Sequence, residues 1–355
     1  MALHSWLLAA LCLGAARAVV FEGGDPFRED AICSPPESSR PVGLCKRPHS
    51  CPVNRDGSWL PNCGLPGADA NMQCCAHPSL PHPQGGRRSR RACLQFTKAK
   101  QHCDFQPPAA GSEVRIGDFP YFAGLGYKTR TGDGKTSWAC GGALISENFV
   151  LTAANCARGS PSFGAPAKVR LGAVTFREGE GAGPDAQELD VAQVILHPAY
   201  NASSTRNNIA LLRLADSARL TRAVYPACLF PEEQLPIHRV VLAGAGARSA
   251  ERSDVGKLSK VDLPVVPFGK CQEIYKHSNT YIDELTTICA GEKGRDACVG
   301  DSGAPVVQKE AAPLCNYQIV GITSFGFRQC GSQPAVYTKV QAFLPWIEET
   351  VWGRS

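Results

Sequence analysis

The sequence lacks any apolar run long enough to cross a membrane. The run from Trp6 to Leu13 falls far below the roughly 18 to 20 residues that span a bilayer, and no later run reaches that length. Charged residues make up only 19% of the chain, and the net charge of +5 comes from Lys and Arg that are scattered except in one segment. We therefore expect neither a membrane span nor binding to nucleic acid or to a membrane surface.

Helical patterns are also scarce, whereas glycine and proline are abundant, with 35 and 27 residues. Hydrophobic residues amount to 43%, which excludes a wholly disordered chain, and the glycine and proline content favours a turn-rich β protein. The chain of 355 residues is too long for one ordinary domain of about 100 to 200 residues. We expect two domains and processed segments.

Residues 1–18 have the features of a secretory signal peptide. The apolar run is followed by Ala16-Arg17-Ala18, which puts small residues at the two positions that precede a signal-peptidase cut. We expect a cut after Ala18 and a secreted chain, because the run is too short for the alternative, a membrane anchor. Of the 17 cysteines only Cys12 leaves with the signal, so an even number remains for disulfide pairing.

Six cysteines crowd into residues 33–75, after an N-terminal segment at residues 19–32. This stretch is rich in Pro, Gly, Asn and Ser and is too short to build a large core, so it is typical of loops held by three disulfides. Zinc binding is the alternative, but the stretch has no CxxC pair and secretion disfavours it. The number of cysteines alone leaves the connectivity open.

The spacing of these cysteines, ending in the adjacent pair Cys74-Cys75, resembles the clip domain that precedes the protease domain of arthropod extracellular proteases. We therefore expect a clip domain over residues 33–75. The resemblance implies the pairs Cys33–Cys74, Cys45–Cys63 and Cys51–Cys75.

Residues 76–107 are expected to link this domain to a larger one. Residues 76–92 are polar and rich in proline and glycine, which is typical of an extended, exposed segment. The sequence Arg88-Ser89-Arg90-Arg91 within it resembles a proprotein-convertase site, so we expect a cut after Arg91. A plain solvated run of charge is the alternative interpretation.

In residues 108–355, short apolar runs alternate with turns, which predicts an all-β sandwich or barrel. The C-terminus differs, because Pro345 can begin a helix that places Trp346, Ile347 and Val351 on one face. The apolar runs expected as strands are Phe149–Leu151, Val191–Leu196, Ile209–Leu214, Val240–Leu242 and Tyr317–Ile322.

Three local patterns in this region carry a more specific resemblance. They are Leu151-Thr152-Ala153-Ala154-Asn155-Cys156, Asn207-Asn208-Ile209-Ala210-Leu211-Leu212 and Asp296-Ala297-Cys298-Val299-Gly300-Asp301-Ser302-Gly303-Ala304-Pro305, and they are accompanied by Cys140-Gly141-Gly142 and Val336-Tyr337. In this order and spacing they resemble a chymotrypsin-like serine protease domain. The resemblance implies two packed six-stranded β-barrels with a cleft between them.

Peptide hydrolysis on this scaffold needs a serine nucleophile, a histidine base and an aspartate that orients the histidine. Ser302 matches the nucleophile, but Asn155 stands at the position of the histidine and Asn208 at that of the aspartate. An asparagine amide has no nitrogen that is basic near neutral pH, so it cannot accept the serine proton. Only the oxyanion-hole N–H groups of Gly300 and Ser302 remain, and we expect no working protease.

No substitute base is evident, because none of the eight histidines lies in the three motifs. His197 is the nearest, in a Leu-His-Pro turn that we expect at the surface.

The family is activated by a cut after a basic residue, which frees an Ile-Val-Gly-Gly terminus that pairs with the aspartate before the serine. The matching stretch, residues 107–111, has neither feature. We expect Asp301 to lack its usual partner and the specificity pocket to keep a zymogen-like shape.

The pocket positions give a mixed picture. Asp296 matches the aspartate that receives Lys or Arg in trypsin-like enzymes, and Gly326 matches a pocket wall. Ala335 stands where the family usually has glycine, so its methyl group would narrow the pocket. Asp296 is thus either a ligand-binding residue or a relic with other partners. Ala173 replaces the first acidic ligand of the family's calcium loop, and we expect neither metal nor cofactor.

The same resemblance implies the disulfides Cys140–Cys156, Cys271–Cys289 and Cys298–Cys330. Cys228 resembles the cysteine that tethers the upstream segment, which gives Cys93–Cys228 and leaves Cys103–Cys315 as the remainder. Asn201-Ala202-Ser203 is the one glycosylation sequon, and we expect Asn201 to carry a glycan.

The resemblance as a whole implies a secreted clip-domain serine protease homologue without catalysis, in arthropod haemolymph. It further implies a cofactor or regulatory role in an innate-immune protease cascade, most often the activation of prophenoloxidase for melanisation. The expected partners are extracellular proteases or prophenoloxidase. Two alternatives stay open, namely recognition of microbial surfaces and an active trypsin-like protease that uses an unusual base.

Overall fold

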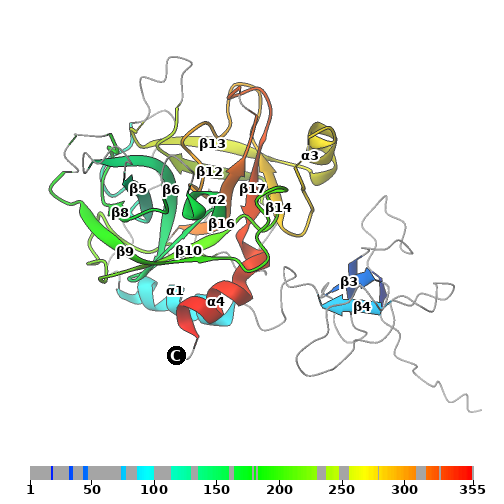
Figure 1. The fold of residues 1–355 in the computed structure, drawn as a ribbon, viewed down its shortest axis with the longest axis horizontal. Coiled ribbons are helices and arrows are strands. Elements are labelled where there is room, and N and C mark those ends of the chain that lie inside the picture. Colours follow the sequence, from blue (N-terminus) through cyan, green and yellow to red (C-terminus); the bar gives the residue numbers. More distant parts are fainter. Residues whose placement is uncertain are drawn as a thin grey trace, which may run out of the picture. The chain divides into compact units, whose positions relative to one another are not determined.

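The chain forms two compact units, Met1–Pro83 and Gln84–Ser355 (Figure 1). The structure is a computed structural model. It describes residues 17–18, 32–34, 43–46, 73–76, 86–99, 113–128, 135–159, 164–177, 180, 183–229, 237–247, 256–278, 280–308, 317–327 and 329–353. No helix in these ranges is long and apolar enough to cross a membrane.

The smaller unit contains an antiparallel sheet in the order β1-β2-β3-β4. Its strands are β1 (Arg17–Ala18), β2 (Ile32–Ser34), β3 (Gly43–Lys46) and β4 (Gln73–Ala76). The register of β3 and β4 pairs Cys45 with Cys74 along the backbone. The side chains of this unit lie outside what the structure describes, so the three disulfides expected in the clip domain stay predictions.

The larger unit contains a closed antiparallel barrel in the order β10-β7-β6-β5-β8-β9. Its strands are β5 (Phe122–Lys128), β6 (Thr136–Ser146), β7 (Phe149–Thr152), β8 (Lys168–Leu171), β9 (Gln187–Leu196) and β10 (Ala210–Leu214). The apolar residues of β5, β7 and β10 are almost all buried, which is how short hydrophobic runs close a barrel around a packed interior.

The second barrel runs in the order β16-β15-β12-β13-β14-β17, and β17 pairs back with β16 to close it. Its strands are β12 (Arg239–Gly244), β13 (Ser259–Val266), β14 (Thr287–Ala290), β15 (Pro305–Gln308), β16 (Gln318–Phe325) and β17 (Ala335–Lys339). The short strand β11 (Cys228–Leu229) joins β16 in parallel outside this ring. Two six-stranded barrels were expected, and the structure confirms them.

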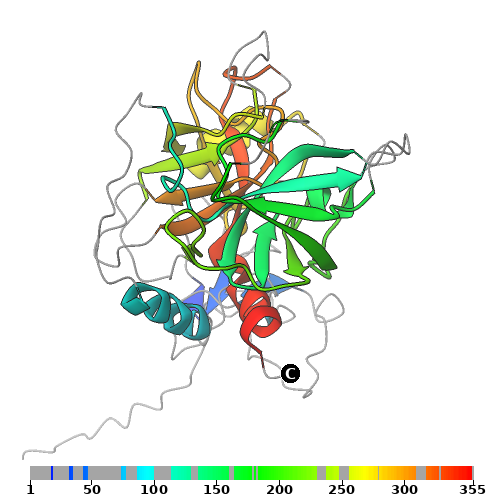
Figure 2. The ribbon, with the colours of Figure 1, turned by 90° about the vertical axis from the view of Figure 1, so that its left-hand side faces the viewer.

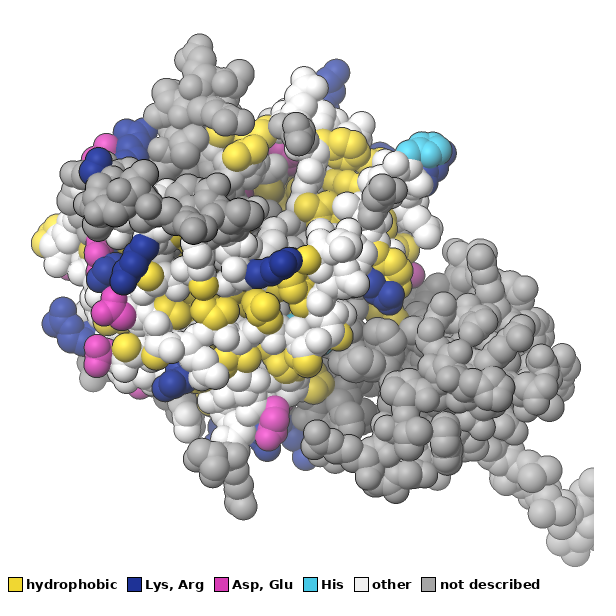
Figure 3. Space-filling view, viewed as in Figure 1, with side chains coloured by type: hydrophobic (Ala, Val, Ile, Leu, Met, Phe, Trp, Pro, Cys, Tyr) yellow, Lys and Arg dark blue, Asp and Glu magenta, His cyan; other side chains and the backbone are white. Residues whose placement is uncertain are grey.

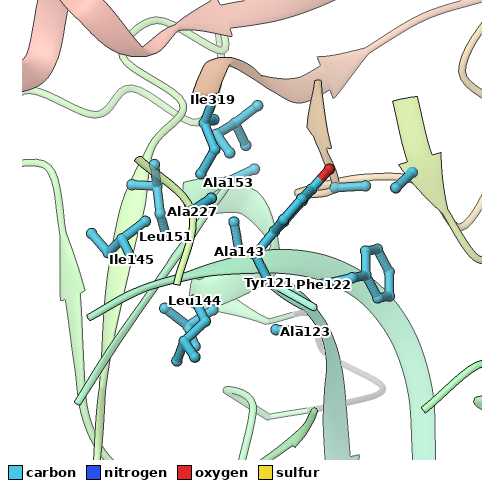
Figure 4. Packing of buried hydrophobic residues seen from close by; sticks show 14 of the residues in the cluster. Tyr121, Phe122, Ala123, Ala143, Leu144, Ile145, Leu151, Ala153, Ala227 and Ile319 are labelled. Atoms are coloured by element: carbon cyan, nitrogen blue, oxygen red, sulfur yellow. The ribbon is translucent and has the colours of Figure 1, made fainter. Parts of the chain in front are cut away.

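One hydrophobic core joins the two barrels. Figure 4 shows Tyr121, Ala143 and Leu151 of the first half of the unit close to Ile319 of β16. The Tyr121 ring also meets the Tyr317 ring edge-on, with 4.9 Å between the ring centroids. The barrels are therefore packed on each other through apolar side chains, and this packing fixes the loops that carry the site.

The helices of the larger unit are short. They are α1 (Arg87–Ala99), α2 (Ala154–Arg158), α3 (Phe268–Tyr275), the 3₁₀ turn η2 (Val340–Phe343) and α4 (Leu344–Trp352). The predicted C-terminal helix is confirmed as α4, which buries Leu344 and Ile347 and packs Trp346 and Val351 against the core. The five apolar runs expected as strands lie in β7, β9, β10, β12 and β16, apart from their terminal residues Ile209 and Tyr317.

The prediction that residues 76–92 are extended and exposed is wrong from Arg87 onward. This stretch begins helix α1, which lies beside α4 at one end of the larger unit (Figures 1 and 2). Ser89, Ala92 and Cys93 are buried on one side of the helix, while the neighbouring arginines are exposed. The spacing of these three small residues places them on one helical face, and that face outweighs the polar composition.

Candidate functional site

The three triad positions lie where loops of the two barrels meet. Asn155 is in the first turn of α2 directly after β7, Asn208 lies just before β10, and Ser302 lies just before β15. The Gly141 N–H of β6 donates to the Ser302 carbonyl at 2.9 Å, and Thr152 Oγ1 donates to the Gly141 carbonyl at 2.8 Å. These bonds hold the serine loop against the segment that leads into Asn155.

Asn208 is 1% exposed, and both ends of its amide are hydrogen-bonded. Its Oδ1 accepts from the Asn155 backbone N–H at 2.9 Å, and its Nδ2 donates to Ser324 Oγ at 2.8 Å. Thr338 Oγ1 also donates to the Asn208 carbonyl at 2.9 Å. The side chain is thus oriented by fixed partners, and none of them is a histidine.

Asn155 is exposed, and its Oδ1 accepts from the backbone N–H of Cys156 at 2.9 Å. Asn155 lies in the first turn of α2, after the N-cap residue Ala153, so this oxygen is bonded to a backbone N–H of its own helix. An amide in this role can neither take a proton from serine nor return one to a leaving group.

Tight glycine turns shape the Ser302 loop. Gly303 has φ +76°, and a Cβ there would lie 2.3 Å from Thr152 Oγ1 and 2.4 Å from the Gly141 carbonyl oxygen. Gly300 has φ +99°. The N–H groups of Gly300 and Ser302, the two donors expected for the oxyanion hole, belong to this loop, and whether they form that hole stays a prediction.

The prediction that His197 lies at the surface is wrong, because only 4% of the residue is exposed. Its ring packs edge-on against Phe343 and Trp346, with centroids 5.1 and 5.0 Å apart, and its Nδ1 accepts from the Ala199 N–H. Burial lowers the pKa of His197 to about 4. The C-terminal helix covers this histidine, and its side chain bonds to none of the triad positions in the described part of the chain.

Asp301 is fully buried beside the serine. Its Oδ1 accepts from the Gly246 N–H and its Oδ2 from the Cys298 N–H, both at 2.9 Å. Backbone donors therefore hold both carboxylate oxygens. Residues 107–111 lie outside the described residues, so the altered activation terminus and the zymogen-like pocket stay predictions.

Two of the three residues expected to line the specificity pocket, Asp296 and Ala335, are buried. Asp296 is 6% exposed, and its Oδ1 accepts from the Gly331 N–H at 2.7 Å. Ala335 is fully buried, and its methyl carbon would be 3.4 Å from a Cβ at Gly326. A side chain larger than glycine at position 326 would therefore touch the Ala335 methyl group. This arrangement favours the view of Asp296 as a relic with an internal partner.

The structure forms four disulfides of the larger unit in the pairs expected. They are Cys93–Cys228, Cys140–Cys156, Cys271–Cys289 and Cys298–Cys330. Cys140–Cys156 ties α2, and with it Asn155, to β6. Cys103 and Cys315 lie outside the described residues, so their pairing stays a prediction.

Two other expected positions are placed by the structure. Asn201 is exposed, and its Oδ1 accepts from the N–H groups of Ser203 and Ser204 in a tight turn. Ala173 is 6% exposed in the loop after β8. Glu180 of the same loop accepts from Thr175 and pairs with Arg177, so its carboxylate already has protein partners.

Sequence reasoning missed three residues around the site. Ser324 accepts the Asn208 amide, and Arg206 lies over the Tyr281 ring at 3.8 Å from its centroid. Arg206 is flanked by Thr205 and Asn207, which have positive φ values of 56° and 51°. No local motif marks these contacts, because they join residues far apart in the chain. Ser324 could only have been suspected from its place near the end of an apolar strand.

Exposed apolar side chains occur next to residues of the site. In the described ranges five large hydrophobic residues are exposed, and three of them adjoin site residues. Val299 (52%) precedes Gly300, Phe327 (40%) follows Gly326, and Tyr281 (40%) lies under Arg206. We call these three residues the apolar rim. Figure 3 shows hydrophobic side chains across the middle of one face of the larger unit.

Comparisons with known proteins agree with this geometry. A family model described as Trypsin matches residues 109–347. Serine protease snk of Drosophila melanogaster is 38% identical over 246 residues, which cover 67% of this chain but only 55% of that protein. Phenoloxidase-activating factor 3 of Holotrichia diomphalia is 34% identical over 68% of this chain and 71% of its own length. CLIP domain-containing serine protease HP8 of Bombyx mori is 34% identical over 67% of each chain. The chain therefore belongs to the trypsin family of chymotrypsin-like serine proteases, among its clip-domain members.

Proposed function

We propose that this protein is a secreted, non-catalytic member of its family that regulates an extracellular immune protease cascade by binding other proteins. The observation that carries the proposal is the pair Asn155 and Asn208, which stand where hydrolysis needs a base and its orienting carboxylate. Their amides are engaged with backbone and hydroxyl groups, so they support the fold of the site rather than proton transfer.

The size of the catalytic loss supports this proposal. In a serine protease, removal of the catalytic base lowers turnover by a factor of about 10⁶, which is about 8 kcal/mol of transition-state stabilisation. The N–H groups of Gly300 and Ser302 can still stabilise an oxyanion, but they cannot activate the serine. The alternative, an active protease with an unusual base, finds no support in His197, whose ring is packed under α4.

The apolar rim suits the site for binding. Monomeric proteins expose few clustered apolar side chains, and such clusters mark interaction surfaces. Val299 and Phe327 adjoin Gly300 and Gly326 in the chain, and Tyr281 lies under Arg206, while the disulfides Cys140–Cys156 and Cys298–Cys330 and the Asn208–Ser324 hydrogen bond fasten the nearby loops. A rigid apolar surface binds a partner without a large loss of conformational entropy.

We infer the role of this protein in an immune protease cascade from the names of its relatives. One of them is named as a phenoloxidase-activating factor and another as a clip-domain protease. The signal-like N-terminus and the disulfides suit an oxidising, extracellular compartment. We therefore propose a haemolymph protease or prophenoloxidase as the partner, and melanisation as the output.

The test is a reconstituted cascade that contains an activating protease and prophenoloxidase. We expect added protein to change phenoloxidase output, and we expect Ser302→Ala to have the same effect as wild type. The triple variant Tyr281→Ser, Val299→Ser, Phe327→Ser should lose most of the effect. The control pair Leu94→Ser, Ile116→Ser, at exposed apolar positions elsewhere, should keep it.

Loss of the effect in folded Ser302→Ala would show that the protein acts by catalysis. No effect of the wild type on phenoloxidase output would remove the cascade role, and retention on bacterial cells in that case would favour microbial recognition instead.

A further inference from the structure

The basic segment Arg88–Arg91 is docked on the C-terminal helix. The Ser89 backbone N–H donates to Glu348 Oε1 at 2.7 Å, and Arg88 forms an ion pair with Glu349 at 2.8 Å. Figures 1 and 2 show α1 and α4 at the same end of the larger unit. Two consecutive acidic residues of α4 thus hold the first turn of α1.

The hydrogen bond from Ser89 to Glu348 is stronger than the ion pair between Arg88 and Glu349. It is 5% exposed, whereas the side chain of Glu349 is 71% exposed. A buried carboxylate that accepts an N–H in the first turn of a helix satisfies a backbone group that has no partner within the helix, and its negative charge favours the helix N-terminus. A hydrogen bond to a charged group in a buried position also resists solvent screening. Glu348 therefore acts as a cap supplied by another helix.

The other end of α1 is fastened separately. Cys93 is bonded to Cys228 of β11, and Tyr225 Oη donates to the Phe96 carbonyl at 2.6 Å. The Phe96 and Tyr225 rings also meet edge-on, with 6.4 Å between centroids. The C-terminal half of α1 can therefore stay in place when its first turn opens.

A helix in this state is a poor protease substrate. An endoprotease binds its substrate as an extended chain, but the Arg90 N–H donates to the Gly86 carbonyl at 3.0 Å, and Ser89 and Ala92 are buried. The side chains of Arg88, Arg90 and Arg91 are exposed, yet the backbone that a protease must bind is not free. A cut after Arg91 requires that the first turn of α1 leave α4 and unwind.

We propose that Arg88–Arg91 is a latent processing site for a convertase-type endoprotease, and that Glu348 of α4 controls whether it is cut. Hydrolysis would break the Arg91–Ala92 peptide bond, with water supplying the oxygen of the new Arg91 carboxylate and protons for the new Ala92 amine. Cys93 would stay with the larger fragment. The inference goes beyond the proposed regulatory function and does not depend on it, because it concerns only the α1–α4 contact.

The test uses the secreted full-length chain and an endoprotease that cuts after Arg-X-Arg-Arg. The rate of appearance of the Ala92 N-terminus is measured by N-terminal sequencing and divided by the rate for the same chain reduced and unfolded. We expect wild type to be cut much more slowly when folded. Glu348→Ala should raise the normalised rate about tenfold, whereas the control Glu349→Ala should change it by less than about twofold, because exposed ion pairs contribute little.

A second variant keeps the test informative if Glu348→Ala unfolds the whole larger unit. Ser89→Pro removes the donated N–H and disfavours helix at Arg88, while proline is tolerated in a first turn. It should raise the normalised rate as well, with the thermal midpoint of the larger unit little changed. The proposal is overturned if folded wild type is cut at Arg91 as fast as unfolded chain, if neither variant is cut faster than wild type, or if the unfolded chain is not cut at Arg91.

Discussion

Asn208 has the size of an aspartate but offers one acceptor and one donor group instead of two acceptors. Its Oδ1 takes the Asn155 N–H, and its Nδ2 gives a hydrogen to Ser324, so both groups are satisfied in a buried place. Buried polar groups are costly when a partner is lost. The residue at the old aspartate position is thus a structural link between α2 and β16.

We predict that Asn208→Ala lowers the free energy of unfolding by about 2–3 kcal/mol, because it leaves the Asn155 N–H and the Ser324 hydroxyl without their partner. The matched control, Asn155→Ala, removes an exposed side chain with one acceptor and should lower it by less than about 1 kcal/mol. Urea denaturation measures both. Equal losses in the two variants would contradict the structural role of Asn208.

His197 makes stability depend on pH. Burial lowers its pKa from 6.5 to about 4, so between these values the unfolded state binds more protons than the folded state. Stability from neutral His197 is present above pH 6.5 and is lost as the pH falls toward 4. Over this window we predict that wild type loses about 1–3 kcal/mol more than His197→Gln, which stays neutral. Identical pH dependence in urea denaturation of the two proteins would show that His197 is protonated without penalty.

At the scale of elements, α1 depends on its anchor in β11. The Cys93–Cys228 disulfide spans 135 residues and joins the helix to the strand that pairs with β16. We predict that Cys93→Ser with Cys228→Ser lowers the free energy of unfolding by about 2–4 kcal/mol and speeds amide hydrogen exchange throughout α1. The double variant Cys298→Ser, Cys330→Ser serves as control and should leave exchange in α1 unchanged. Slow exchange in α1 without its disulfide would mean that the contacts with α4 and the Tyr225–Phe96 contact are enough to hold the helix.

The sequence predicted the elements whose pattern is local. Apolar runs bounded by turns marked β7, β9, β10, β12 and β16, and a proline before three apolar residues marked α4. Helix α1 was missed because its buried face consists of Ser89, Ala92 and Cys93, which carry little hydrophobic signal. Its docking could not be foreseen either, since Glu348 lies 259 residues away from Ser89 and no local pattern marks a capping carboxylate on another helix.

In the candidate site, too, local motifs could be recognised in the sequence and contacts between distant residues could not. Motifs placed Asn155, Asn208 and Ser302 in the chain, and the barrels bring their loops together. His197 was expected at the surface because it lies in a Leu-His-Pro turn, but Trp346 of the C-terminal helix, which is far along the chain, packs against its ring. Tertiary packing of this kind is not encoded in the neighbouring residues.

At the scale of the whole molecule, the larger unit keeps the framework of a protease, and asparagines stand at two of the three triad positions that the motifs indicate. The barrels, the four described disulfides and the glycine turns around Ser302 are intact. A scaffold of this kind can present loops to a partner without chemistry. We therefore propose that binding and not hydrolysis is the activity of this protein.

The most direct test is turnover of Arg and Lys peptide amides by the purified protein, in its intact form and after processing, against Ser302→Ala prepared in the same way. We predict no difference between wild type and Ser302→Ala, because the amides of Asn155 and Asn208 cannot act as a base for the serine. Turnover by wild type that is abolished in Ser302→Ala would rule out the proposed non-catalytic function and show a working protease.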